Sequence, residues 1–563
     1  MRKKRILFCS EATFLNTGYA TYTREILNYL HGTGKYEIAE MGSYGEMNDA
    51  RAKDIPWKYY GVVPNQNSEP KAPQEQLEAY NSVPTNQFGE WIFEHVCLDF
   101  LPDIVCDIRD FWMLDFAERS PFRHYFKWAV MPTVDAAPQA RQWIATYSGA
   151  DACFTYSDWA GGVLEDQSGG KINYLGSAPP SAHPAYSPVK DKKAHKVSMG
   201  INPEYKVIGT VMRNQRRKLY PDLFIAFRKF LDNAKSKNYY LYCHTSYPDL
   251  GWDIPELLQQ HELSSHILFT YICAQTNKPF VSTFKGAVAQ SPYSGRWGSK
   301  LSNVKNGLSY EDLSRVMNCF DLYTQYANCE GFGLPQVEAA ACGVPVCGTD
   351  YSAMESVLRK LEGYPIKPKS LYKELETGCY RAVPDNDLAA EYFLDFFENK
   401  SEEERAEIGN VTRKNFEKYY QWHLSGSKWE NYFDSVEIQP FEKTWGSPAN
   451  IQSPQEKIEI QQGTSSKQLA KWLIANVLRD PSKLNSYFEF RLTRDLTYQS
   501  ATNSTGGMYF NENSAAFSGQ NTRHPFNFDL AYDQMVGICD RRNQWEQKRI
   551  DRMSKIQEGL SNS

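Results

Sequence analysis

Short apolar runs alternate with amphipathic segments along the first part of the chain. Buried strands are predicted over 5–9, 104–108, 127–131 and 152–156, and residues 22–30 repeat their apolar side chains at helical spacing. Such an alternation of strands and helices is typical of βα units, which build parallel sheets. We therefore predict an α/β protein.

The same alternation starts again after a polar segment at 187–194 that contains Pro and Lys, and this segment predicts a linker between two domains. Beyond it, strands are expected at 206–211, 239–243 and 322–326, and a helix is expected at 221–233. Two similar halves follow from this repetition.

The pattern changes after Trp429. Residues 452–466 are rich in Gln and Ser, and residues 503–521 form a Gly, Ser and Asn segment that cannot build a core. Helices are predicted beside this segment, at 467–478 and 527–555. The predicted divisions are a first domain at 1–190, a second at 200–415, a helix that crosses back at 416–436 and a mainly helical extension at 440–563.

Composition and charge narrow the class of protein. The 563 residues suit two to four domains at roughly 100 to 200 residues each. With 62 basic and 67 acidic side chains the formal net charge is −5, and no run approaches the roughly 18 apolar residues of a membrane span. The 12 cysteines include no CxxC pair, which favours reduced thiols in a cytoplasm.

The most informative segment is 328–346. A strand that ends near Ala327 leads into a glycine-containing turn and then into a helix from about Pro335. The backbone N–H groups of such a turn, at the start of a helix, can bind a diphosphate, and the donor-side candidates of this segment are Gly331, Phe332, Gly333, Leu334 and Glu338. We expect Glu330 to reach a group beyond the phosphates and Glu338 to accept hydrogen bonds from a ribose. The alternative is a connection whose glycines serve the turn alone.

The segment Glu330-Gly-Phe-Gly-Leu-Pro, followed by Glu338-Ala-Ala-Ala-Cys-Gly-Val-Pro-Val, closely resembles the EX7E signature of family-4-type retaining glycosyltransferases, the glycosyl transferases group 1. The resemblance covers roughly residues 5–430 and is strongest in the second half. It implies a GT-B fold, in which two doubly wound Rossmann-like domains face each other across a cleft, the first for the acceptor and the second for a nucleotide sugar.

The resemblance also implies roles for residues elsewhere in the chain. Arg213 and Lys218 match the cationic pair that stabilises the leaving diphosphate, although Arg216 and Arg217 lie between them and a solvated cluster is the alternative. Gly18 takes the place of the family's glycine loop in the first domain, which approaches the donor phosphate and the acceptor, so that Gly18 is a donor-binding candidate; a simple turn is the alternative. Asp135 is the acceptor-side candidate, in a segment where many relatives carry a histidine; a structural role is the alternative.

The reaction that the resemblance implies is transfer with retention of the anomeric configuration, by front-side displacement and without a protein nucleophile. The expected donor is a nucleotide sugar, of the UDP-sugar type, and no metal or other cofactor is expected. Asp385-Asn-Asp387 has the form of a metal-binding DxD motif, but it precedes an apparent helix and is interpreted as an N-cap.

A basic insertion is predicted at 271–310, which contains no Asp or Glu. Cations among aromatic side chains suit a nucleic acid, because phosphates pair with the cations and bases stack on the rings. A solvated loop is the alternative. Lys305 also lies here, and the candidate contacts are Lys278, Lys285, Arg296, Trp297 and Lys300.

The leading acceptor is DNA that carries a 5-hydroxymethylated pyrimidine. Long, aromatic-rich versions of this fold resemble glycosyltransferases of tailed-phage type, some of which modify such bases, and the acid-free basic insertion and the C-terminal extension favour this acceptor. Such an enzyme would work in the cytoplasm, that of the host if phage-encoded. The alternatives are a polysaccharide or lipid-linked glycan acceptor, a catalytically idle GT-B scaffold, and a sugar-nucleotide epimerase. The sequence does not indicate the oligomeric state.

Overall fold

A computed structural model describes residues 2–120, 122–303, 307–440, 443–446, 544–545 and 547–559. Three predictions lie outside these residues: the helix at 467–478, the part of the second predicted helix at 527–543, and the side chain of Lys305. The described residues 544–545 and 547–559 are helical. None of the described helices is long and apolar enough to cross a membrane.

The first part of the chain forms a parallel sheet with the strand order β3-β2-β1-β4-β5-β6-β7. Its strands are β1 (Lys4–Glu11), β2 (Tyr36–Glu46), β3 (Lys58–Val63), β4 (Ile104–Asp107), β5 (Lys127–Val130), β6 (Ala152–Thr155) and β7 (Tyr174–Ser177). The run from Ile6 to Cys9 has no exposed surface, as expected for a strand covered on both faces. From β1, successive strands are added on one side as β2 and β3 and on the other side as β4 to β7, which is the doubly wound arrangement.

The helices of this first domain are α1 (Gly18–Thr33), α2 (Gln74–Asn81), α3 (Phe93–Phe100), α4 (Phe111–Arg119), α5 (Arg141–Ser148) and α6 (Asp158–Ser168). The side chain of Thr17 caps α1 by accepting from the backbone N–H of Ala20, and Gly34 ends the helix in the left-handed conformation.

The second domain has a sheet with the strand order β12-β13-β10-β9-β8-β14-β15-β16. The strands from β10 to β16 in this order are parallel to one another. Their bounds are β8 (Lys206–Val211), β9 (Tyr239–His244), β10 (Ile267–Ile272), β14 (Leu322–Gln325), β15 (Val346–Thr349) and β16 (Tyr364–Ile366). The helices are α7 (Lys192–Ser198), α8 (Tyr220–Asn233), α9 (Ile254–Gln260), α10 (Tyr310–Met317), α11 (Leu334–Ala341), α12 (Ala353–Leu361) and α13 (Asn386–Leu394). The predicted α/β class, with two doubly wound parallel sheets, is confirmed.

The predicted linker differs in one respect, because α7 already begins at Lys192. Asp191 caps this helix by accepting from the backbone N–H of Ala194.

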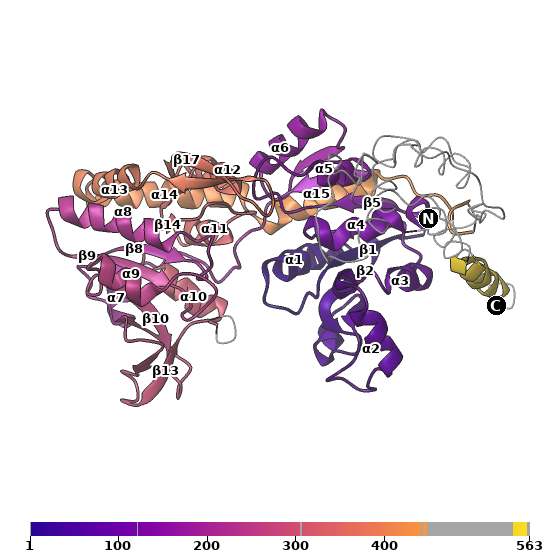
Figure 1. Ribbon diagram of the computed structural model, residues 1–563, viewed down its shortest axis with the longest axis horizontal. Helices are drawn as coiled ribbons and strands as arrows, with labels where there is room; N and C mark the ends of the chain where they lie inside the picture. Colours follow the sequence, from indigo (N-terminus) through magenta and orange to yellow (C-terminus); the bar gives the residue numbers. More distant parts are fainter. Residues whose placement is uncertain are drawn as a thin grey trace, which may run out of the picture.

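Two additions extend the second domain. The basic insertion forms antiparallel strands β11 (Pro279–Thr283), β12 (Val288–Gln290) and β13 (Trp297–Leu301), which project from the end of β10 (Figure 1). A separate hairpin of β17 (Pro368–Lys373) and β18 (Tyr380–Pro384) follows β16. The sequence pattern did not predict this hairpin.

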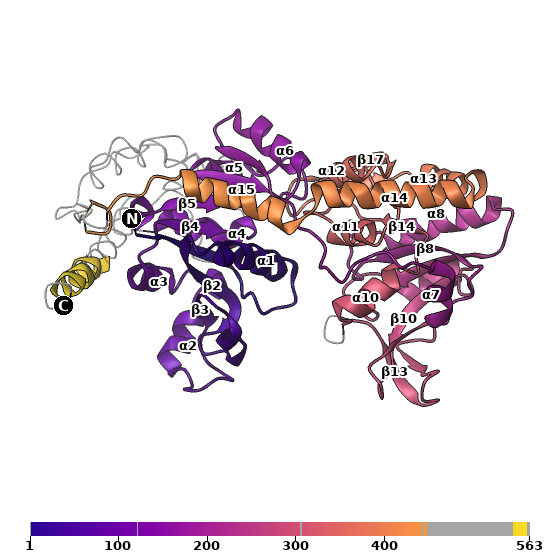
Figure 2. The same ribbon diagram turned by 180° about the vertical axis from the view of Figure 1, so that it is seen from behind.

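Helix α14 (Glu402–Tyr419) lies along the second domain, and α15 (Trp422–Ser435) continues over the first domain (Figure 2). The indole of Trp429 has no exposed surface, and its Nε1 donates to the hydroxyl of Tyr22, 3.0 Å away. The α15 segment therefore completes the core of the first domain.

The described residues of the C-terminal extension pack on the first domain. The indole of Trp445 is buried, stacks on Tyr125 and donates from Nε1 to the carbonyl of Pro102 at 3.1 Å. Trp545 lies edge-on against Phe122 in the same cluster. The extension is thus joined to the face of the first domain that α3 and β5 help to form.

Candidate functional site

The candidate site is built around the turn between β14 and α11. β14 lies between β8 and β15 in the middle of the second sheet, and all its residues are buried. In an open parallel sheet, ligands bind outside the carboxyl ends of the strands. The central position of β14 therefore places Glu330, which follows this strand, at the edge where a ligand is expected.

Glu330 is buried, and polar groups surround its carboxylate. Gln325 donates from Nε2 to one carboxylate oxygen at 2.7 Å, and Arg217 donates from Nη1 to the other at 3.2 Å. The ammonium of Lys218 also pairs with this carboxylate. The backbone N–H of Glu330 donates to the hydroxyl of Ser352 at 2.9 Å, which fixes the turn.

Lys218 is held beside Glu330 by its backbone, which forms a bridge with Ala327. Burial, and then the neighbouring Arg217 guanidinium, lower the pKa of Lys218, whereas the nearby Cys329 opposes this change. The structure thus brings together two of the predicted site residues, Glu330 and Lys218.

The backbone of the turn leaves donors at the start of α11. Gly333 adopts a φ of +84° at the N-cap, where a residue with a side chain would be strained. Within the described residues, no acceptor takes the backbone N–H groups of Phe332, Gly333 and Leu334. These groups fit the predicted anion-binding role.

Glu338 lies one turn further along α11 and is buried. Burial raises the pKa of this carboxyl to about 7, and the adjacent Tyr186 hydroxyl opposes the rise. Tyr186 belongs to the segment that joins the two domains. Glu338 therefore lies where the second domain meets this connection.

Arg213 is not brought to Glu330. Its guanidinium is exposed and forms two hydrogen bonds of 2.9 Å with Asp249, and this pairing lowers the pKa of Asp249 to about 2. Arg217, one of the two arginines between Arg213 and Lys218, lies beside Glu330 instead. The role of Arg213 at the diphosphate stays a prediction. The pattern contained four neighbouring cations and could not show which of them faces the turn.

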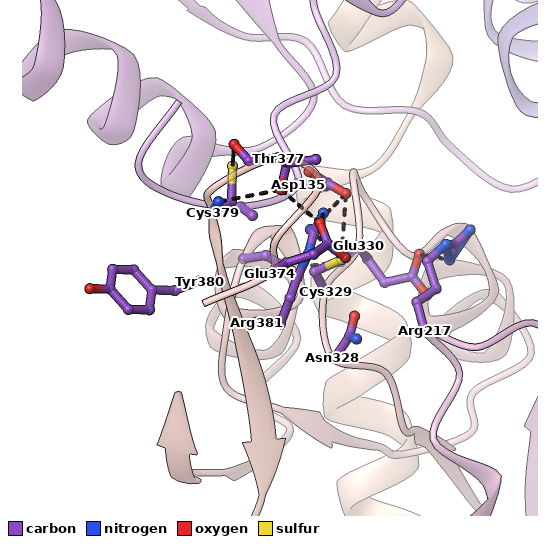
Figure 3. Close-up of polar contacts among 12 residues, drawn as sticks. Asp135, Arg217, Asn328, Cys329, Glu330, Glu374, Thr377, Cys379, Tyr380 and Arg381 are labelled. Carbon is purple, nitrogen blue, oxygen red and sulfur yellow. Dashed lines mark hydrogen bonds and ion pairs between the residues drawn. The ribbon is translucent and has the colours of Figure 1, made fainter. Parts of the chain in front are cut away.

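The loop after β5 brings the first domain against this turn. A Cβ atom at Gly331 would lie 2.4 Å from Cγ2 of Thr133, so the glycine permits close contact between the two domains. Asp135, from the same loop, pairs with Arg381 of β18 at 3.0 Å, and the Arg381 Nη1 also donates to Sγ of Cys329 (Figure 3). Sequence reasoning missed Arg381, because it belongs to no motif.

A polar group on the first domain lies beside Thr133. The hydroxyl of Tyr19 donates to Asp110 at 2.7 Å and contacts the hydroxyl of Thr133. Burial raises the pKa of Asp110 to about 6. Asp110 follows β4, and its position after a buried strand is the signal that could have identified it.

Gly18 begins α1, and a Cβ atom there would meet no atom within 4 Å. The space at this helix start is open, and no atom of the described residues requires glycine. Residue 18 stays a predicted donor-binding position.

The insertion presents its cations to solvent. Lys278, Lys285, Arg296 and Lys300 are all exposed, and none of them pairs with a carboxylate of the described residues. The exposed fraction of Trp297 is 67%, whereas Phe280 stacks on Tyr271 and Phe284 packs on Phe269 within the domain. The aromatic residues therefore divide into a packed group and an exposed one.

The DxD-like segment caps α13, because the side chain of Asp385 accepts from the backbone N–H groups of Asp387 and Leu388. Across the described part of the chain, no three or more His, Cys, Asp and Glu side chains are grouped as metal ligands.

Comparison with known proteins places this geometry in a family context. Residues 300–415 match the family model described as "Glycosyl transferases group 1". A stretch of 131 residues is 28% identical to sucrose synthase from Solanum tuberosum; it spans 23% of this chain and only 14% of that relative.

Several solved structures share the architecture of the whole two-domain unit. Sucrose-phosphate synthase from Thermosynechococcus elongatus matches 77% of this chain and 98% of its own, with a TM-score of 0.55 and 14% identity. The Anabaena protein HepE in complex with UDP matches 77% of this chain and all of its own, with a TM-score of 0.52 and 12% identity. Residues 300–415 are therefore a domain of the glycosyl transferases group 1 family, carried within a GT-B fold.

Proposed function

We propose that this protein is a retaining glycosyltransferase that moves a sugar from a UDP-sugar to a hydroxyl acceptor. The observation that carries the proposal is the cluster of Glu330, Lys218 and Arg217 at the start of α11, directly opposite Thr133 of the first domain. The structural neighbour HepE, in complex with UDP or with UDP-glucose, supports the choice of donor.

In this proposal the second domain holds the donor. The diphosphate lies against the backbone N–H groups of residues 332–334 and is neutralised by Lys218 and Arg217, without a metal. Glu330 then accepts hydrogen bonds from the sugar hydroxyls, and Glu338 from the ribose. Arg213 joins the diphosphate only if its pair with Asp249 opens.

The bond between the anomeric carbon and the diphosphate oxygen breaks, and the electron pair leaves with the diphosphate. The acceptor oxygen bonds to the same face of the anomeric carbon, and its proton passes to the departing phosphate oxygen. The two cations stabilise the charge that develops on the diphosphate. Contact between the two domains excludes water, which would otherwise hydrolyse the donor.

For the acceptor we propose DNA with a 5-hydroxymethylated pyrimidine. The basic insertion extends from the carboxyl end of β10, the edge of the sheet at which Glu330 lies. Its four exposed cations can pair with phosphates, and the exposed Trp297 can stack on a base. A base inside a duplex must be flipped out before its hydroxyl reaches the transfer site. A polysaccharide or lipid-linked glycan acceptor is the alternative, supported by the structural neighbour WaaG, a glycosyltransferase involved in lipopolysaccharide biosynthesis.

The decisive experiment is nucleoside mass spectrometry after incubation of the protein with a panel of nucleotide sugars and DNA, with and without 5-hydroxymethylated pyrimidines. We expect a hexose or pentose mass gain on the modified base alone.

The site is tested by two variants. Glu330→Gln and Lys218→Ala should each lower the transfer rate at least about a hundredfold, because each removes a group at the reacting centre. Full activity in both variants would refute the site.

The insertion is tested separately by DNA binding at several salt concentrations. We expect weaker DNA binding in the fourfold variant, in which Glu replaces Lys278, Lys285, Arg296 and Lys300. The slope of the logarithm of the binding constant against the logarithm of the salt concentration should become smaller by about one for each cation that pairs with a phosphate in the wild type. Lys237→Glu is the matched control, because this exposed lysine precedes β9 at the opposite edge of the same sheet. Transfer to a glycan acceptor, with unchanged DNA binding in the fourfold variant, would reject the DNA acceptor.

The transfer assay also distinguishes the remaining alternatives. Nucleotide release without any acceptor would favour an epimerase or a hydrolase, and no turnover at all would favour a binding scaffold.

A further inference from the structure

Arg381 is a buried guanidinium that holds three separate segments of the chain. Its Nη1 donates to Asp135 of the first domain at 3.0 Å and to Sγ of Cys329 at 2.8 Å. Its Nη2 donates to Glu374, in the β17–β18 hairpin, at 2.6 Å. Only 6% of Arg381 is exposed, whereas the side chains of Asp135 and Glu374 keep 36% and 27% of their surface. Figure 3 shows these side chains gathered around the guanidinium.

The backbone of the same hairpin also contacts the loop after β5. The N–H of Tyr380 donates to the carbonyl of Ala137 at 2.8 Å, and Sγ of Cys379 donates to the carbonyl of Pro138 at 3.0 Å. The hydroxyl of Tyr351 donates to the carbonyl of Tyr380 at 2.6 Å. The β17–β18 hairpin thus lies alongside residues 135–138 of the first domain. Within this interface, Arg381 forms the charged contact.

The two residues that Arg381 joins each lie next to the transfer site. Cys329 immediately precedes Glu330, and Asp135 is two residues from Thr133, whose methyl group meets the turn at Gly331. A guanidinium can bind both segments at once because it carries donors in a fixed planar fork. Arg381 therefore contacts the acceptor-side loop and the donor-side turn at the same time.

We propose that Arg381 is a positioning residue for sugar transfer: it holds loop 131–139 of the first domain against turn 328–334 of the second without touching the donor. This inference rests on the proposed transferase function. It also explains why an aspartate stands at position 135, since a carboxylate can pair with Arg381.

Removal of this contact should separate donor binding from transfer. Apart from Gly18 of α1, the groups that would hold the nucleotide lie on the second domain, and no hydrogen bond or ion pair of the described residues joins any of them to Arg381, so nucleotide affinity should stay within about twofold. Transfer depends on the spacing between the two segments, and a misplacement of about 1 Å can cost about a hundredfold in rate. We expect Arg381→Gln to lower kcat for transfer about ten- to a hundredfold and to raise the share of donor consumed by hydrolysis.

The matched control is Lys360→Ala. Lys360 of α12 pairs with Asp158 of α6 at 2.7 Å, so it also joins the two domains, but neither residue contacts the turn at 328–334. This variant should keep kcat and the hydrolysed share within about twofold of the wild type. Arg381→Lys, which keeps the charge but not the fork, should recover only part of the rate.

A second readout does not depend on turnover. Spin labels on Lys171→Cys and Lys237→Cys, two exposed positions on different domains, report the distance between the domains. We expect Arg381→Gln to lengthen or broaden this distance, and Lys360→Ala to leave it unchanged. If the wild type glycosylates no acceptor, the proposed function fails while the label distances still decide the role of Arg381.

The inference is overturned if Arg381→Gln folds and matches Lys360→Ala in kcat, in the hydrolysed share and in label distance. Should Arg381→Gln fail to fold, Asp135→Asn carries the test, because it keeps the size of the side chain and removes only the charge. A loss of transfer with unchanged nucleotide affinity in Asp135→Asn would then support the proposal. A transfer rate in Asp135→Asn equal to that of the wild type would reject it.

Discussion

Glu338 shows how burial and a binding role conflict at a single residue. Burial raises its pKa to about 7, so the folded protein keeps a proton that the unfolded chain releases above about pH 4.5. The unfolded state therefore binds fewer protons between these two values, and stability falls as the pH rises from about 4.5 to 7. The ionised carboxylate, in contrast, is the stronger acceptor for ribose hydroxyls.

Glu338→Gln should separate these two effects. At pH 8 we expect the variant to be more stable than the wild type, by on the order of 3 kcal/mol if the whole shift is relieved, and the gain should be much smaller at pH 5. UDP affinity should fall about tenfold, because an uncharged amide replaces the carboxylate. Urea unfolding at both pH values and titration calorimetry with UDP check this. An equal stability change at pH 5 and pH 8 would contradict the linkage.

At the scale of elements, the turn before α11 depends on close contact with the first domain. In Gly331→Ala the new methyl group would collide with Cγ2 of Thr133, which is fixed by the contact of its hydroxyl with Tyr19. We expect the transfer rate to fall about a hundredfold, since the turn must shift away. Thr133→Ser removes the colliding methyl group, so the double variant should recover much of the rate in steady-state assays. No recovery would mean that the loss has another cause.

The start of α1 offers the opposite case. A Cβ at Gly18 meets no atom, so Gly18→Ala should melt within a few degrees of the wild type and lose transfer activity only if a ligand approaches this helix end. Gly32→Ala is the matched control, because a Cβ there also meets no atom and lies at the far end of the same helix. Equal activity in both variants would remove Gly18 from the site. Thermal melts and transfer assays provide the comparison.

The elements that could be predicted from the sequence are those with local patterns. Continuous apolar runs predicted β1, β4 and β8, because strands of a parallel sheet are buried on both faces. The segment 330–338 predicted the turn, because glycine at the N-cap and the carboxylate spacing are local features. Arg381 and Asp135 could not be paired in advance, since they are 246 residues apart and only the meeting of the two domains brings them together.

On the scale of the whole molecule, the chain crosses between the domains more than once, and the last crossing completes the first domain. α15 follows the second domain in sequence, yet Trp429 lies between Phe8 and Phe154 of the first sheet. The core of the first domain therefore includes residues from both ends of the two-domain unit. The complete core thus depends on a segment more than 400 residues from β1.

Trp429→Ala tests this dependence. The variant leaves a cavity in the first domain and a hydroxyl of Tyr22 without its indole donor, so we expect a loss of about 3 to 5 kcal/mol in unfolding free energy. Trp112→Ala is the control, because half of that indole is exposed and its loss should cost less than about 1 kcal/mol. Urea unfolding followed by circular dichroism measures both. UDP should still bind Trp429→Ala below its transition, since the residues proposed to hold the donor lie on the second domain. If Trp429→Ala is as stable as Trp112→Ala, α15 contributes little to the core of the first domain. If Trp429→Ala loses UDP binding in the same transition in which the first domain unfolds, the two domains unfold as one unit.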